Sequence, residues 1–453
     1  MKTFQKILLA TVLFTLMFYD ENIGLNFGIL GISYSLILLV STPKNLKTRT
    51  FFILFVMSGF ASAAFAWYGD FVSFAATFMS VALLSFKAKS KELKSVFVIP
   101  VFAITFFSFI YRIFLFDRWL PKINTQGSSQ KVLAVVIIPA VLLSAFFGIY
   151  TLGSDHFANI LNFNWNVNIW LLLVMICLGF FFAFNFFNPW IPGFVHSQNH
   201  FLKNNFIQED RIAKPTYSFM DLDAERTSGL VSLVALNILL VFFIITYNYE
   251  QFYEHVKTPV QLSRETHERV NAVILSIIMA IVVIMFYFKS NFNFDEKAKP
   301  LKTAAKIWIV LNAVLVCSAI LKNLEYFVNY GATYKRFGFF AFLLLCLIGL
   351  VLTFIKIQRR KTNAFLINHM VWYFYGTVLA ASFINWGEIA TLYNIKNQKG
   401  DFHFLRTLNF NHKILEENFP KETDDNFDYE IWNQQRQTPL SKILYYQTLK
   451  NRK

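Results

Sequence analysis

The stretch KNLEYFVNYGATYKR, residues 322–336, lies between two apolar runs that are each long enough to cross a membrane. Its polar and aromatic residues recur at spacings of three and four, which predicts one face of a helix that continues beyond a span ending near Leu321. Gly331 allows the turn that follows. Lys335 and Arg336 stand where the next run begins, a position from which basic side chains reach lipid headgroups. The stretch therefore predicts a polar connection between two membrane helices.

The composition excludes an ordinary soluble domain, because 56% of the 453 residues are hydrophobic and 15% are charged. The runs are too long and too evenly apolar for the alternating strands of a membrane barrel. We predict an all-α fold, a polytopic membrane helical bundle with a small soluble C-terminal tail. The net charge of +15 comes from short links between apolar runs, which is typical of membrane topology, so no nucleic-acid partner is expected.

About twelve apolar segments can be counted: 7–19, 25–40, 51–67, 71–86, 96–116, 132–152, 167–187, 229–247, 270–288, 304–321, 337–355 and 366–384. Basic links after the second and fourth segments indicate a cytoplasmic amino terminus. Simple alternation then puts the basic links at 289–306 and 356–361 outside, against the same rule. Either one segment between residues 96 and 187 does not cross, or a crossing is missed, so the number of crossings and the side of the tail stay open.

Four parts are expected along the chain: N-terminal transmembrane segments (1–187), a long extramembrane link (188–228), C-terminal transmembrane segments (229–395) and the soluble tail (396–453). The tail's apolar residues predict short helices that rest on the membrane part; they are Phe402, Leu405, Leu408, Ile414 and Leu415. Small residues predict helix-packing faces: Gly24, Gly28 and Gly31 in the second segment, and Ser58, Gly59, Ser62 and Ala63 in the third.

A polar site near one membrane face is predicted from charges at segment ends, formed by His267, Glu268, Lys322, Glu325, Tyr326 and Arg336. Glu325 has two candidate partners, Lys322 one helical turn away and Arg336 after the turn. A histidine beside a carboxylate can relay protons. Alternatively, Thr266 as a helix N-cap with Glu268 in the first turn explains that pair without chemistry.

Other polar residues give weaker signals. Arg112, near the end of the fifth segment, either snorkels to the headgroups or contacts an anion in a cavity. His196 and His200 have a zinc-ligand spacing but no neighbouring third ligand, so no metal is expected.

The remaining expectations concern the three cysteines, possible catalytic groups and the segment at residues 385–394. Cys177, Cys317 and Cys346 have no paired spacing and are interpreted as buried apolar residues, and His369 as an interfacial histidine. No catalytic set can be assembled and no cofactor is expected. We predict an interfacial motif of Asn385, Trp386, Tyr393 and Asn394, with aromatic rings in the headgroup belt and amides that cap helices.

Several motifs taken in order resemble a bacterial membrane family known only as a domain of unknown function, the related families numbered 4153 and 4173. They are Leu222 to Thr227, Leu236-Asn237, His267-Glu268, Asn323 to Tyr326, Tyr334 to Gly338, Asn385-Trp386, Ile389-Ala390, Tyr393-Asn394 and Asp401 to Leu405. The resemblance covers about residues 221–408. It implies a multi-pass protein of the bacterial cytoplasmic (inner) membrane and supplies no substrate.

Three functions remain open. The first is a transporter or permease that uses the predicted polar site. The second is a non-catalytic envelope component or assembly subunit that binds a partner through its long link and tail. The third, a membrane enzyme acting on lipid or a lipid-linked sugar, is the least expected, since enzymatic activity has no identified residues. Expected partners are membrane lipids and either an envelope protein or a second copy of the chain.

Overall fold

The computed structural model describes residues 1–120, 168–207, 219–253, 259–289, 291–420 and 425–449, with single positions at 139, 143, 146, 150 and 422. Of residues 251–253, 259–270, 291, 425–428 and 430 it describes the backbone alone. Within these ranges every regular element is helical, apart from one isolated bridge between Asn205 and Lys361. The predicted all-α fold is confirmed.

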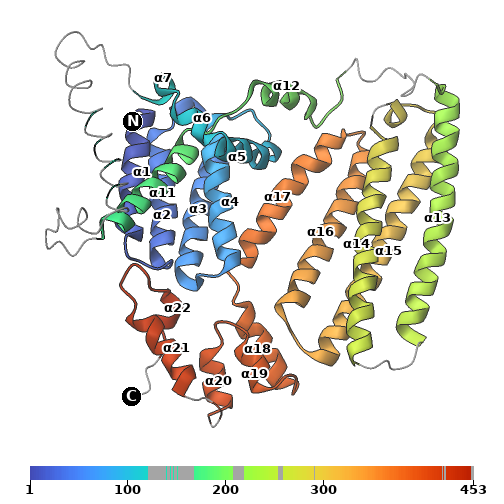
Figure 1. Ribbon diagram of the computed structural model, residues 1–453. Helices are drawn as coiled ribbons and strands as arrows, with labels where there is room; N and C mark the ends of the chain where they lie inside the picture. The colour runs from blue at the N-terminus through green and yellow to red at the C-terminus, as the bar shows by residue number, and fades with distance from the viewer. Residues whose placement is uncertain are drawn as a thin grey trace.

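Two helical groups stand side by side, with the tail at one end of both (Figure 1). The first group holds α1 (Thr3–Phe18), α2 (Leu25–Ser41), η1 (Lys44–Leu46), α3 (Arg49–Tyr68), α4 (Phe71–Lys89), η2 (Ser95–Phe97), α5 (Val98–Phe107), α6 (Phe109–Ile113), α7 (Phe116–Trp119), α11 (Ile169–Phe187) and α12 (Gly193–Phe201). The second holds α13 (Leu222–Tyr253), α14 (Pro259–Tyr287), η5 (Asn291–Asn293), α15 (Lys299–Tyr330) and α16 (Tyr334–Gln358). α17 (Asn363–Ala381) lies between the groups, and α18 (Trp386–Lys396), α19 (Phe402–Arg406), α20 (His412–Asn418), α21 (Asp425–Arg436) and α22 (Leu444–Gln447) form the tail.

Seven helices in the described ranges are long and apolar enough to cross a membrane: α3, α4, α11, α13, α15, α16 and α17. α1, α2, α5 with η2, and the apolar part of α14 are shorter apolar helices. This confirms the polytopic membrane bundle. The expected segment 132–152 falls almost wholly outside the described residues.

The fifth expected segment, residues 96–116, does not cross. Before it, the Lys94 N–H donates to Asn199 of α12 at 2.9 Å; near its end, Arg112 donates to Asn185 near the end of α11 at 3.1 Å. Both contacts lie at the end of the bundle where α4 and α11 finish, and α5, α6 and α7 all lie there (Figure 1). Ser108 separates α5 from α6, which leaves only short helices. The ends of α2, α4, α14 and α16 then lie at this same end, so the basic links at 44–49, 87–94, 289–306 and 356–361 share one side (Figure 1).

α2 and α3 pack through small residues. A Cβ added at Gly31 would overlap the hydroxyl of Ser62 and lie 2.9 Å from Cγ2 of Thr77 on α4, so the helices approach as closely as glycine permits. Ser58 and Ser62 are buried as predicted. The prediction is wrong for Gly59, which has open space around a would-be Cβ, and for Ala63, which is exposed.

α17 joins the two groups. Its Tyr375 and Leu379 belong to the buried apolar cluster of the first group, and the Tyr375 hydroxyl lies 2.9 Å from Ser80 of α4. The same helix packs on α16 of the second group. A third apolar cluster, in the tail, contains the expected residues Phe402, Leu405, Leu408 and Leu415; Ile414 is also buried. The four expected chain divisions stay a prediction.

α14 begins at Pro259, so Thr266 lies inside the helix. The alternative interpretation of Thr266 as an N-cap is therefore wrong.

Gly31→Val should lower the melting temperature of the purified chain, because the added methyls meet Ser62 and Thr77 and overpacking costs about 1–3 kcal/mol. Gly59→Val is the matched control, since nothing lies within 4 Å of its added Cβ. Thermal unfolding in detergent compares the two. Equal melting temperatures would show that α2 and α3 do not depend on this close approach.

Candidate functional site

Arg336, near the start of α16, is held by contacts with the end of α15 and with the turn between the two helices. Its guanidinium lies 4.1 Å from the ring centroid of Tyr326, and Nη1 donates to the Gly331 carbonyl. The Arg336 carbonyl accepts from the Asn323 amide at 3.3 Å, and Thr333 caps the start of α16. The arginine thus closes the turn between α15 and α16, and stacking on Tyr326 adds a cation–π contact.

Glu325 pairs with Lys322, the first of its two candidate partners. Their charged atoms are 3.1 Å apart, and the Glu325 side chain is 46% exposed. An exposed ion pair one helical turn apart contributes about 0–1 kcal/mol. α15 continues to Tyr330 before Gly331 turns with a φ of +84°, as predicted.

The turn is clasped by the tail. The Ala332 N–H donates to Asn394 Oδ1 at 2.6 Å, and Asn394 Nδ2 donates back to the Ala332 carbonyl at 3.0 Å. Both residues are fully buried. The side-chain amide therefore imitates a backbone partner for a residue of the turn that is sealed from water. A Cβ at Gly331 would overlap Asn394 Oδ1, which is a second reason for glycine there.

Further contacts fix α16 and α18 to the residues just before α20. The Asn409 N–H donates to the Tyr334 hydroxyl at 2.9 Å, and a Cβ at Gly387 would overlap the Asn409 carbonyl. Asn411 donates to Thr391 of α18 at 2.7 Å. Polar contacts thus join four segments that are distant in sequence, and those of Asn394 and Asn411 are buried.

The interfacial motif serves the same junction. Asn385 caps α18, as predicted for an amide. Trp386 packs on Phe337 with ring centroids 5.0 Å apart, and Tyr393 packs on Phe327 at 4.5 Å. Both rings are half-buried against α15 and α16, and their place in the headgroup belt stays a prediction.

The predicted polar site stays a prediction, because two of its residues have side chains outside the described residues. His267 and Glu268 lie in α14, but their side chains are outside the described residues. His369 bonds the carbonyl of Phe365 within α17 at 2.7 Å, a satisfied histidine near the start of its helix. Cys346 is buried, whereas Cys177 and Cys317 are exposed on the surface of the apolar helices. The described residues contain no group of three or more potential metal ligands.

Residues 49–413 match the family described as a domain of unknown function, DUF4153. The chain belongs to this family. No curated protein and no solved structure matches it. The matched region of this DUF4153 member runs from the start of α3 into α20, so it includes the whole clasp between the α15–α16 turn and the tail. α1, α2, α21 and α22 lie outside it.

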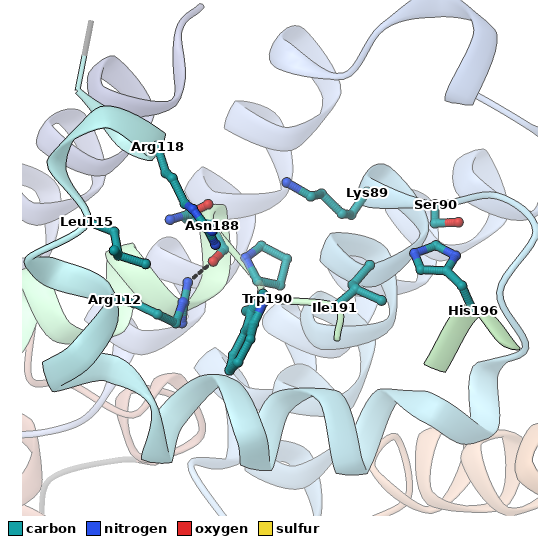
Figure 2. Close-up of a pocket in the computed structure, with 10 residues that line it drawn as sticks. Lys89, Ser90, Arg112, Leu115, Arg118, Asn188, Trp190, Ile191 and His196 are labelled. Carbon is teal, nitrogen blue, oxygen red and sulfur yellow. Dashed lines mark hydrogen bonds between the residues drawn. The ribbon is translucent and has the colours of Figure 1, made fainter. Parts of the chain in front are cut away.

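At the opposite end of the DUF4153 chain, a pocket of about 380 Å³ opens between the ends of α4, α6, α7 and α11 (Figure 2). Its lining residues are Lys89, Ser90, Arg112, Leu115, Arg118, Asn188, Pro189, Trp190, Ile191 and His196. Sequence reasoning singled out Arg112 and His196 separately. It missed that they share a pocket, because residues 112 and 188–196 meet only through the packing of α6 against α11.

Gly387→Ala should release the tail, because the added methyl overlaps the Asn409 carbonyl and overpacking costs about 1–3 kcal/mol. We expect faster protease cleavage between α18 and α20, since cleavage follows the population of the open form. Gly338→Ala is the control, with open space for its Cβ. Equal cleavage rates of the two variants would contradict the clasp.

The tail should also lose stability in acid. Burial and the nearby Arg406 lower the pKa of His412 from 6.5 to about 4, so the folded tail holds this ring neutral. A folded pKa below the unfolded value gives stability that is complete above pH 6.5 and falls as the pH drops toward 4, by about 3 kcal/mol. Tail proteolysis against pH measures it. His412→Gln should flatten the dependence, whereas His403→Gln, at an exposed position, should retain it; an unchanged profile in His412→Gln would refute the assignment.

Proposed function

We propose that this DUF4153 member is a multi-pass protein of the bacterial cytoplasmic membrane, with its amino terminus in the cytoplasm. The ends of α2, α4, α14 and α16 and the start of α15 bring basic residues to one end of the bundle; among them are Lys44, Lys47, Lys87, Lys89, Lys289, Lys299, Lys356 and Arg359. At the opposite end the α1–α2 and α3–α4 links carry Asp20, Glu21 and Asp70, and the basic residues of the described helix links there are Lys335 and Arg336 at the α15–α16 turn. Basic links favour the cytoplasmic side, which puts the tail on the outer face.

On that face the protein acts as a non-catalytic envelope component that binds a partner protein through α21. The observation that carries this proposal is a stack of exposed side chains. The ring centroids of Tyr429 and Trp432 lie 5.6 Å apart with an interplanar angle of 28°, and the Arg436 guanidinium lies 4.1 Å from the centroid of the Trp432 ring. Tyr429 is 61% exposed and Trp432 40%. These three residue types dominate the binding energy of protein interfaces.

The stack is presented rigidly. Ile431, on another face of α21, is buried in the tail's apolar cluster. Gln435 donates to the carbonyls of Tyr446 and Leu449, both at 2.8 Å. Because α21 is already fixed by these contacts, little conformational entropy is lost when a partner covers Trp432.

A transporter or permease is the other function that the sequence predicts, and it stays a prediction. Transport at residues 322–336 requires charged groups around a shared cavity. Lys322 and Glu325 instead form an exposed pair, and Arg336 is engaged with Tyr326 and Gly331. Enzymatic action on lipid also stays a prediction.

One set of experiments on spheroplasts tests both the orientation and the partner. A membrane-impermeant maleimide should label Lys399→Cys in a background without the three native cysteines, and should label Lys47→Cys only after permeabilisation. An impermeant amine crosslinker should join the wild-type chain to a second protein, and the double variant Tyr429→Ser/Trp432→Ser should lose that product at least tenfold. Leu392→Ser, exposed on α18, is the control and should keep it.

The two parts of the proposal fail separately. Labelling of Lys47→Cys in intact spheroplasts would reverse the orientation. A crosslinked product that survives the double variant, or no product from the wild type, would overturn partner binding through α21.

A further inference from the structure

The pocket at the basic end has an unbalanced charge. Lys89, Arg112 and Arg118 reach it from α4, α6 and α7, with His196 on its rim, and no carboxylate lines it (Figure 2). Among the described residues, none of these three cations forms an ion pair. Three positive groups around one cavity repel one another, so an anion that enters the cavity stabilises all of them.

Arg112 makes this a built site. Only 6% of the residue is exposed, and its guanidinium lies 4.9 Å from the ring of Phe184. It donates to the carbonyls of Thr105 and Asn188 and to the amide oxygen of Asn185. These partners are neutral, so they orient the guanidinium without balancing its charge. These bonds use three of its five N–H donors.

The surroundings of the pocket select an amphiphile. The helices α5, α6 and α7 stay at this end of the bundle and expose large apolar side chains: Phe107 is 91% exposed, Ile110 72%, Phe114 67% and Tyr111 62%. Apolar groups this exposed on a segment at the end of a membrane bundle are covered by hydrocarbon. Trp190 lines the pocket between the two environments, and tryptophan is favoured at the membrane interface.

We propose that this pocket binds the phosphate of an anionic phospholipid whose acyl chains lie along the exposed apolar side of α5–α7. The guanidinium and the lysine donate charge-assisted hydrogen bonds to phosphate oxygens. A headgroup with its own ammonium is disfavoured, because it brings a fourth cation to a cavity that lacks a carboxylate. The ligand class is therefore a phospholipid with a phosphate and no amine, such as phosphatidylglycerol. The volume of about 380 Å³ lies in the range of small-ligand pockets.

Native mass spectrometry of the purified full chain in detergent tests the site, with phosphatidylglycerol, phosphatidylcholine and inorganic phosphate as probes. Wild type should bind phosphatidylglycerol at least tenfold more tightly than phosphatidylcholine. The double variant Lys89→Gln/Arg118→Gln should lose about tenfold or more of that affinity, because the phosphate loses two charged hydrogen-bond donors. Lys44→Gln, basic and exposed at the same end but outside the pocket, should bind as wild type does.

Arg112→Gln should abolish the preference; the double variant keeps the test valid if loss of this buried side chain prevents folding. Equal affinity of wild type and double variant for phosphatidylglycerol would overturn the site. Equal binding of both lipids would overturn the headgroup selection. Inorganic phosphate distinguishes a lipid from a soluble anion. If it binds the wild type as tightly as phosphatidylglycerol does and displaces that lipid, the ligand is a soluble anion and the lipid assignment is wrong.

Discussion

Every peptide group in hydrocarbon must find its hydrogen-bond partner inside the protein, and the rest of this structure depends on that constraint. Helices satisfy it along the spans. Hydroxyl side chains within the spans return to the backbone four residues earlier, as Thr77, Ser80 and Thr353 do. Polar groups with tertiary partners are mostly gathered at the two ends, where helices stop and carbonyls lose their partners. The two ends of the bundle supply different partners to these carbonyls.

At the basic end, cations meet helix carbonyls. Lys356 is fully buried and donates to the Phe288 carbonyl at the end of α14 at 3.0 Å, and Arg112 does the same for Thr105 and Asn188. At the tail end, amides and glycines replace charges. Asn394 supplies both hydrogen bonds of Ala332, and Gly387 lets α18 approach the Asn409 carbonyl. Buried cations therefore satisfy the carbonyls at the basic end, whereas close packing of amides and glycines satisfies the backbone at the tail end.

The sequence predicts much of the fold, because runs of apolar residues and Gly331 report on local structure alone. It also predicts the apolar residues of the tail, whose spacing marks one face of short helices. It does not predict that Trp386 and Tyr393 pack on Phe337 and Phe327, since an interfacial aromatic and a covered one look the same in sequence. Arg112 shows the same limit. Its position in the sequence is consistent both with snorkelling to the headgroups and with a place in a cavity, and only the packing of α6 on α11 shows that it lines a pocket. Glu325 could reach either cation by spacing, and the stack of Arg336 on Tyr326 decides between them.

The tail also contacts the first group of helices. The N–H groups of Leu25 and Asn26, at the start of α2, donate to the carbonyls of Lys442 and Leu440, each at 2.8 Å, and the Asn22 N–H donates to Ser441 at 2.7 Å. These bonds join residues more than 400 positions apart. During synthesis the first helical hairpin therefore enters the membrane long before the groups that complete its turn leave the ribosome. The turn between α1 and α2 therefore keeps water as the partner of these N–H groups until residues 440–442 have been made.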